Sequence, residues 1–179
     1  MQIGQIARTC PEGIIVREKD LTEYEYEKLA DEVLKICIQY HVPCILHTYV
    51  NAARRLGVDA VHLPLPLLRS MSKEQKNSFS VLGASVHSVE EALLAQEAGA
   101  TYLTAGHVFA TDCKRGVPPR GLSFLREVCA AVTLPVYALG GIHQENAAAC
   151  IQAGARGVCL MSACMQRTDW TGGYKDWKY

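Results

Sequence analysis

Seven short apolar runs, separated by segments of helical character, constrain the fold of this chain more than any other feature. The runs are Gly13–Arg17, Cys44–His47, Asp59–Leu63, Ser80–Val86, Thr101–Ala105, Pro135–Leu139 and Gly157–Met161. They are near-continuously apolar and do not alternate between apolar and polar residues as a half-exposed strand does. Strands of this kind, alternating with helices, indicate a parallel sheet covered by helices.

The segments between the runs have the patterns of helices. We expect helices over about Glu23–Tyr40, Asn51–Leu56, Ser70–Asn77, Val89–Ala98, Leu122–Val132 and Gln144–Gln152. In the first of them apolar residues recur at i, i+3, i+4 and i+7, and Asp20 or Thr22 is expected to cap it. Ser88 followed by Glu91 predicts a capping box at the start of the fourth.

This alternation favours a (β/α) barrel of the TIM type over an open doubly wound sheet. Polar or small residues recur at the carboxyl ends of runs along the whole chain, whereas a doubly wound sheet binds its ligand at one switch point. The chain has 179 residues, fewer than the about 200 at the lower limit for closed barrels, and seven strands are predicted in place of eight. We therefore expect one barrel domain over residues 1–179 that lacks its first strand and last helix, with residues 165–179 as an unassigned tail. An unpaired strand edge would favour self-association into a homo-oligomer.

The composition narrows the classes of partner. The formal net charge is zero, so nothing indicates binding to nucleic acid or to an anionic membrane. No apolar stretch reaches the about 18 residues of a membrane span, and the N-terminus has no signal-peptide pattern. The eight cysteines form no CxxC pair and are expected to be reduced thiols of a cytoplasmic protein rather than metal ligands.

A long loop, Gly106–Gly121 (GHVFATDCKRGVPPRG), follows the fifth run. Connections between a strand and a helix usually have about 2–6 residues, and longer ones are often binding loops. His107 is its first side chain and would lie at the barrel mouth, where an imidazole can take up and release a proton. A structural histidine is the alternative, and Lys114 could equally lie on a solvated surface. Cys113 has no evident base partner and is not expected to act as a nucleophile.

Two features at consecutive strand ends predict a phosphate site. Gly140-Gly141 follows the sixth run, and Ser162-Ala163 follows the seventh. Backbone N–H groups at such ends can hold a phosphate without a basic side chain, and barrels often bind phosphate after strands seven and eight. The alternative is that the glycines only permit tight turns.

Polar side chains also end the first and fourth runs. Arg17 and Lys19 suit an anionic ligand, with ordinary surface charge as the alternative. Ser85 is expected to face the mouth, and His87 is expected to cap the following helix.

These pieces together resemble the thiamine phosphate synthase/TenI superfamily of (β/α) barrels. The matching segments are REKDL at Arg17–Leu21, GASVHSVEEA at Gly83–Ala92, GHVFATDCKRG at Gly106–Gly116, PVYALGGI at Pro135–Ile142 and AGARGVCLMSA at Ala153–Ala163. They occur in the same order and with similar spacing across most of the chain.

This superfamily contains two kinds of enzyme, and their sequence motifs differ. Thiamine phosphate synthases join a pyrimidine diphosphate to a thiazole phosphate with magnesium, and carry an Asn-Asp pair after the second run and an acidic GQED-like segment after the third. This chain has His47-Thr48 and Pro64-Leu65-Pro66-Leu67 there, with no carboxylate for magnesium. The GHVF-x-TDCK loop instead resembles the TenI branch, the thiazole tautomerases.

The TenI resemblance implies a metal-independent proton shift that aromatises a carboxythiazole phosphate, with no cofactor. His107 would be the catalytic residue. The residues expected to bind this small-molecule substrate are Arg17, Lys19, Ser85, Thr111, Lys114, Gly140, Gly141, Ser162 and Ala163. Thiamine phosphate synthesis remains the alternative, and a non-catalytic sensor or regulator that binds a phosphate ligand is a third hypothesis.

Overall fold

The structure is a computed structural model in which residues 2–168 are described. One parallel sheet runs in the order β1-β2-β3-β4-β5-β6-β7, each strand pairing with the next along the chain. The strands are β1 (Ile14–Val16), β2 (Cys44–His47), β3 (Ala60–Pro64), β4 (Val81–Val86), β5 (Tyr102–Gly106), β6 (Val136–Leu139) and β7 (Gly157–Cys159). All seven predicted strands are confirmed within a few residues.

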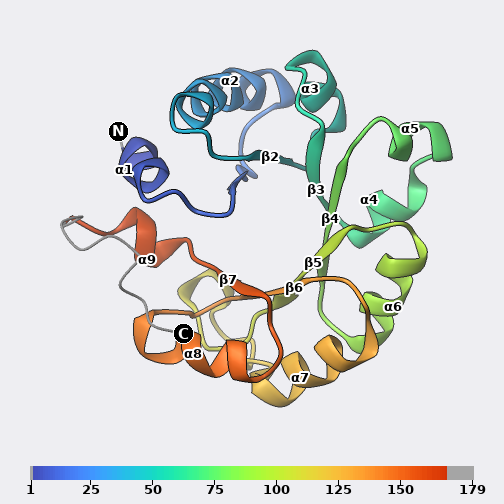
Figure 1. Ribbon diagram of the computed structural model, residues 1–179, viewed down its shortest axis with the longest axis vertical. Coiled ribbons are helices and arrows are strands. Elements are labelled where there is room, and N and C mark those ends of the chain that lie inside the picture. The colour runs from blue at the N-terminus through green and yellow to red at the C-terminus, as the bar shows by residue number, and fades with distance from the viewer. Residues whose placement is uncertain (1, 169–179) are drawn as a thin grey trace.

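The sheet curls into an open barrel, and most helices lie around its outside (Figure 1). The helices are α1 (Gln2–Arg8), α2 (Glu23–Gln39), α3 (Val50–Arg55), α4 (Leu65–Ser70), α5 (Lys73–Asn77), α6 (Val89–Glu97), α7 (Gly121–Ala131), α8 (Gln144–Gln152) and α9 (Ser162–Met165), with a 3₁₀ turn η1 at Asp112–Lys114. Within residues 2–168 β1 and β7 are the two edges of the sheet. The prediction of a TIM-type barrel that lacks parts is thereby confirmed.

The helix boundaries follow local chemistry. Thr22 caps α2 in a capping box with Glu25, which decides between the two predicted caps. The Ser88 hydroxyl accepts from the Glu91 N–H at 3.1 Å, which is the first half of the capping box predicted for the start of α6. The Glu91 carboxylate accepts from the His87 N–H at 2.6 Å and not from that of Ser88, so the box is incomplete. The helix expected over Ser70–Asn77 is present as α5 and begins a few residues later, because Ser72 caps it in a capping box with Gln75. Helix α4, in the connection after β3, was not predicted.

The two faces of the sheet differ in chemistry because successive side chains in a strand point to opposite sides. Apolar side chains on the outer face pack against the helices, among them Leu46, Val61, Leu103 and Ala138, all of them buried. The inner face carries polar groups that bond to one another across strands. The hydrophobic core therefore lies between sheet and helices, and the barrel interior is left for polar contacts.

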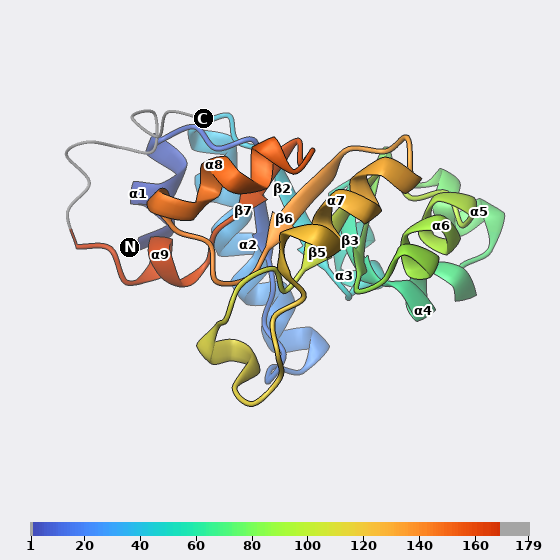
Figure 2. The same cartoon turned by 90° about the horizontal axis from the view of Figure 1, so that it is seen from below.

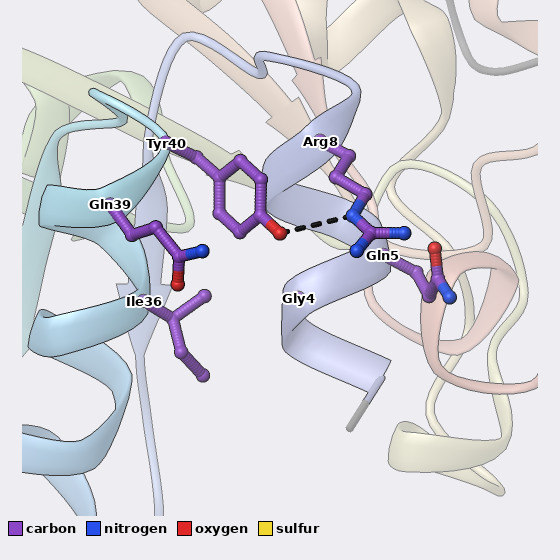
Figure 3. A pocket seen from close by; sticks show the side chains of 6 residues that line it. All are labelled: Gly4, Gln5, Arg8, Ile36, Gln39 and Tyr40. Atoms are coloured by element: carbon purple, nitrogen blue, oxygen red, sulfur yellow. Dashed lines mark hydrogen bonds between the residues drawn. The ribbon is translucent and has the colours of Figure 1, made fainter.

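Helix α1, which was not predicted, lies at the open side of the barrel (Figure 1). The Gln2 amide donates to the carbonyls of Cys164 and Arg167 at 2.7 and 2.8 Å. On its other side α1 faces α2 across a groove of about 250 Å³, which the Arg8–Tyr40 hydrogen bond of 3.0 Å spans (Figure 3). Helix α1 thus connects the part of the chain near β7 with the part near β1.

No helix among the described residues is both long and apolar enough to cross a membrane. Residues 169–179, most of the tail whose structure was left unassigned, lie outside the described range.

Candidate functional site

The carboxyl ends of the strands form one end of the open barrel. Figure 2 shows the loop between β5 and α7 projecting from that end, together with the segment that joins β1 to α2. The predicted site residues lie at or after the carboxyl ends of β1, β4, β5, β6 and β7, so they surround a common mouth. Parallel strands place their carboxyl ends on one side, which is where barrel enzymes have their active sites.

His107 lies directly after β5 and is buried, with 4% of its surface exposed. Its Nε2 lies 3.2 Å from the carbonyl oxygen of Val117. A carbonyl only accepts, so Nε2 carries the proton and Nδ1 holds a lone pair. Nδ1 is buried and has no hydrogen-bond partner among the described residues. The ring is thus covered by the loop and does not lie open in the mouth as predicted.

The start of the loop packs directly on the end of β6. The Val108 N–H donates to the Leu139 carbonyl at 2.9 Å, and the Phe109 N–H donates to the Gly140 carbonyl at 3.0 Å. A Cβ on Gly140 would overlap the Cα and Cβ of His107, and Gly140 has φ +101°. Only glycine fits this close approach in this conformation.

Gly141 likewise packs too closely against the following loop residues to carry a side chain. It has φ +64°, and an added Cβ would overlap the carbonyl oxygens of Phe109 and Ala110. The Asn146 amide of α8 donates to the Gly141 carbonyl at 3.0 Å. Packing against the loop therefore explains both glycines without a ligand, and phosphate binding by their N–H groups stays a prediction. Ser162 and Ala163, the other half of that prediction, begin the short helix α9.

The outer part of the loop is exposed. Thr111 precedes the 3₁₀ turn η1, and its carbonyl accepts from the Lys114 N–H at 3.0 Å. Asp112 pairs with Arg115 at 3.1 Å, with both side chains more than four-fifths exposed. Such a pair contributes little to stability. Lys114 and Thr111 are carried by this exposed segment.

Across the mouth, the ends of β1 and β2 bring two cations near a histidine. Burial, with smaller contributions from the charges of Arg17 and Lys19, lowers the pKa of His47 to about 4. Nδ1 of His47 lies 2.6 Å from the hydroxyl of Thr48. Arg17 and Lys19 are therefore both close to His47, in an arrangement that would attract an anion.

Ser85 is half-buried on the inner face of β4 and contacts two neighbouring strands. Its hydroxyl lies 2.9 Å from Nε2 of His62 on β3 and 3.5 Å from the hydroxyl of Thr104 on β5. The prediction that His87 caps the next helix is wrong, because Ser88 does so. The His87 ring instead donates from Nδ1 to the Gly106 carbonyl at 2.6 Å, which ties the end of β4 to the start of the loop.

The ends of β2 and β3 carry no carboxylate. His47-Thr48 and Pro64–Leu67 offer no carboxylate oxygen there, and hard cations such as Mg²⁺ need oxygen ligands. Within residues 2–168 no three His, Cys, Asp or Glu side chains are grouped so that they could hold a metal ion.

Sequence reasoning missed the polar residues of the barrel interior. Nδ1 of His62 lies 2.9 Å from the Tyr102 hydroxyl, and the two rings are in contact. The Tyr137 hydroxyl donates to Glu12 at 2.7 Å. A signal was present in the sequence, since histidine and tyrosine interrupt otherwise apolar strands at positions that share one face.

Three comparisons bear on the identity of the chain. The family model described as thiamine monophosphate synthase matches residues 2–164. Thiamine-phosphate synthase of Clostridium novyi is 34% identical over 166 residues, which cover 89% of this chain and 79% of that protein. Thiamine-phosphate synthase of Lysinibacillus sphaericus is 38% identical over 159 residues, which cover 86% and 75%. The solved thiamine phosphate pyrophosphorylase from Pyrococcus furiosus has a TM-score of 0.82 and 29% identity, covering 96% of this chain and 83% of that one.

Proposed function

Because the chain belongs to the thiamine monophosphate synthase family, we propose that it is an enzyme of thiamine biosynthesis that acts on a thiazole phosphate, and that its reaction is tautomerisation of a carboxythiazole phosphate. The eight cysteines are all free thiols, and the proposal places the reaction in the cytoplasm, where thiols stay reduced.

The names of the relatives favour the alternative, thiamine phosphate synthesis, more directly than they favour tautomerisation. Both curated relatives carry the name thiamine-phosphate synthase, and the solved structure is a thiamine phosphate pyrophosphorylase. Synthesis is therefore the second candidate. The preference for tautomerisation depends on this chain's own residues.

The single observation that carries the proposal is the state of His107. Its Nε2–H is held by the Val117 carbonyl, and the lone pair of Nδ1 is buried without a partner. A buried polar atom without a partner costs free energy unless a ligand or function uses it. Nδ1 is thus the atom that we assign as the base. It is shielded from solvent in the free protein, so the substrate must displace part of the loop to reach it.

The proposed reaction moves one proton. Nδ1 of His107 removes a proton from a carbon atom of the non-aromatic carboxythiazole tautomer. The electrons left behind shift into the thiazole ring, which becomes aromatic. The His107 imidazolium then delivers the proton to a second carbon atom of the substrate, and the imidazole becomes neutral again. Arg17 and Lys19 would stabilise negative charge that develops on the substrate, and the backbone of Gly140 and Gly141 would hold the phosphate. No step needs a metal ion.

The magnesium that synthesis requires does not fit the residues at the ends of β2 and β3. The ends of β2 and β3 offer imidazole, hydroxyl and apolar side chains in place of carboxylates.

The test follows the ultraviolet spectrum of the thiazole tautomer with and without purified protein. We expect acceleration that persists in excess chelator, and a loss of about 10²–10⁴-fold in rate for His107→Ala. His41→Ala, which changes an exposed histidine after α2, is the matched control and should retain the rate.

The second candidate is assayed in parallel with the pyrimidine diphosphate, the thiazole phosphate and magnesium. Product that forms only with magnesium, together with no acceleration of the tautomer, would establish the synthase and refute our proposal. Tight binding of the thiazole phosphate without either reaction would favour a regulator instead.

A further inference from the structure

His62 is the most enclosed polar side chain of the barrel interior, with 2% of its surface exposed. It projects from the middle of β3 and contacts β4 and β5. Its Nδ1 lies 2.9 Å from the Tyr102 hydroxyl, and its Nε2 lies 2.9 Å from the Ser85 hydroxyl and 3.2 Å from the Thr104 hydroxyl. None of these contacts is used by the proton shift at His107.

The sequence leaves space for this arrangement at one position. Gly83 of β4 pairs in register with both His62 and Tyr102. A Cβ on Gly83 would overlap Nδ1 of His62 and the ring of Tyr102. The glycine is therefore required by the His62–Tyr102 hydrogen bond and not by backbone conformation, since its φ lies outside the left-handed region.

The direction of the hydrogen bonds follows from counting donors. Burial raises the pKa of the Tyr102 phenol, so its O–H remains and needs an acceptor, and Nδ1 of His62 is the acceptor that the described residues supply. A neutral imidazole then carries its proton on Nε2, which donates to Ser85 and, more weakly, to Thr104. The reverse tautomer would leave the Tyr102 O–H without an acceptor, which costs free energy.

The same count determines what Ser85 offers to the mouth. The Thr104 hydroxyl is buried and can donate to Ser85 at 3.5 Å. Ser85 then accepts from both His62 and Thr104, and its own hydroxyl proton has no acceptor among residues 2–168. Ser85 is half-buried and lies toward the carboxyl end of β4. Its proton is therefore directed to whatever occupies the mouth.

We propose that Tyr102 and His62 are positioning residues that fix Ser85 as a hydrogen-bond donor to an acceptor atom of the bound ligand, either a carboxylate oxygen or a ring nitrogen. The proposal rests on the proposed function for the ligand, a thiazole phosphate. It does not rest on the reaction, because a donor at Ser85 would serve either candidate activity.

The first test needs no substrate. In protein labelled with ¹⁵N at histidine, long-range ¹H–¹⁵N spectra distinguish the two neutral tautomers, and the signals that disappear in His62→Gln identify His62. We expect wild-type His62 in the Nε2–H form. Tyr102→Phe should shift it toward a mixture, whereas Tyr137→Phe, which removes a hydroxyl bonded to Glu12 from the neighbouring ring, should leave it unchanged. Wild-type His62 in the Nδ1–H form would overturn the proposal.

The second test measures binding of carboxythiazole phosphate by calorimetry. We expect Ser85→Ala to raise the Kd about tenfold, as the loss of one charge-assisted hydrogen bond would. Tyr102→Phe should raise it by a similar factor, and the double variant should lose no more than either single one. Tyr137→Phe should bind as the wild type does. An unchanged Kd for Tyr102→Phe or Ser85→Ala, or additive losses, would overturn the proposal. Absence of turnover with these binding results intact would refute only the proposed reaction.

Discussion

The two sides of the barrel mouth are built differently. At the ends of β5 and β6, the loop is fixed by backbone hydrogen bonds and by glycines that admit no side chain. At the ends of β1 to β3, the exposed cations Arg17 and Lys19 lower the pKa of His47, and no carboxylate is present in His47-Thr48 or Pro64–Leu67. The first side preserves a framework that both candidate reactions could use. The second side carries the residues on which our preference for tautomerisation over magnesium-dependent synthesis depends.

The largest predicted effect tests whether the β5–β6 side is as tightly packed as the geometry indicates. Gly140→Ala adds a Cβ that meets the backbone of His107, at a residue with φ +101°. Overpacking and the unfavourable conformation each cost about 1–3 kcal/mol. We expect the free energy of unfolding, measured by urea denaturation, to fall by about 3–5 kcal/mol.

Gly99→Ala is the matched control for Gly140→Ala. Gly99 also has positive φ, at +91°, but nothing lies within 4 Å of an added Cβ. It should lose only the conformational part, about 1–2 kcal/mol. Equal losses in the two variants would mean that the loop yields easily, and the contrast between the two sides of the mouth would fail.

A second prediction concerns pH and the β2–β3 side. Burial, with smaller contributions from His47 and Arg17, lowers the pKa of His62 to about 3. In the unfolded chain histidine titrates near pH 6.5. Below that pH His62 binds a proton in the unfolded state but not in the folded state. Its contribution to the free energy of unfolding is therefore fully present above about pH 6.5 and is lost as the pH falls toward 3. At pH 5 the loss due to His62 is about 2 kcal/mol.

Urea denaturation at pH 7 and pH 5 measures this loss. His62→Gln should be less stable than wild type at pH 7, yet should lose about 2 kcal/mol less between the two pH values. Carboxyl groups titrate equally in both proteins and cancel in the difference. Parallel pH profiles would show that His62 is protonated in the folded state, contrary to its burial.

The prediction of the fold from sequence succeeded where local pattern and tertiary packing agree. β2 and α8 lie at the predicted bounds, because apolar runs and helical periodicity are local signals. Helix α1 was missed because its stability depends on a contact between distant residues, from Gln2 to Cys164. No pattern within residues 2–8 could indicate that contact.

The site was predicted in part. The loop, His107 and the two glycines could be identified from the sequence. The burial of His107 and the packing that requires Gly140 could not be predicted. Those depend on where the loop crosses β6. His62 and Tyr102 are separated by 40 residues in sequence, and only the register of β3, β4 and β5 brings them together.

The smallest predicted effect concerns Thr48, at the end of β2. Its φ of +70° lies in the left-handed region, which is strained for a β-branched residue and favourable for Asn and Asp. We expect Thr48→Asn to raise the free energy of unfolding by about 0.5–1 kcal/mol. Thr111→Asn, at an extended residue with φ −148°, should bring no gain. A loss at Thr48 would mean that its bond to His47 outweighs the strain. A gain would show that the backbone strain at Thr48 outweighs its bond to His47.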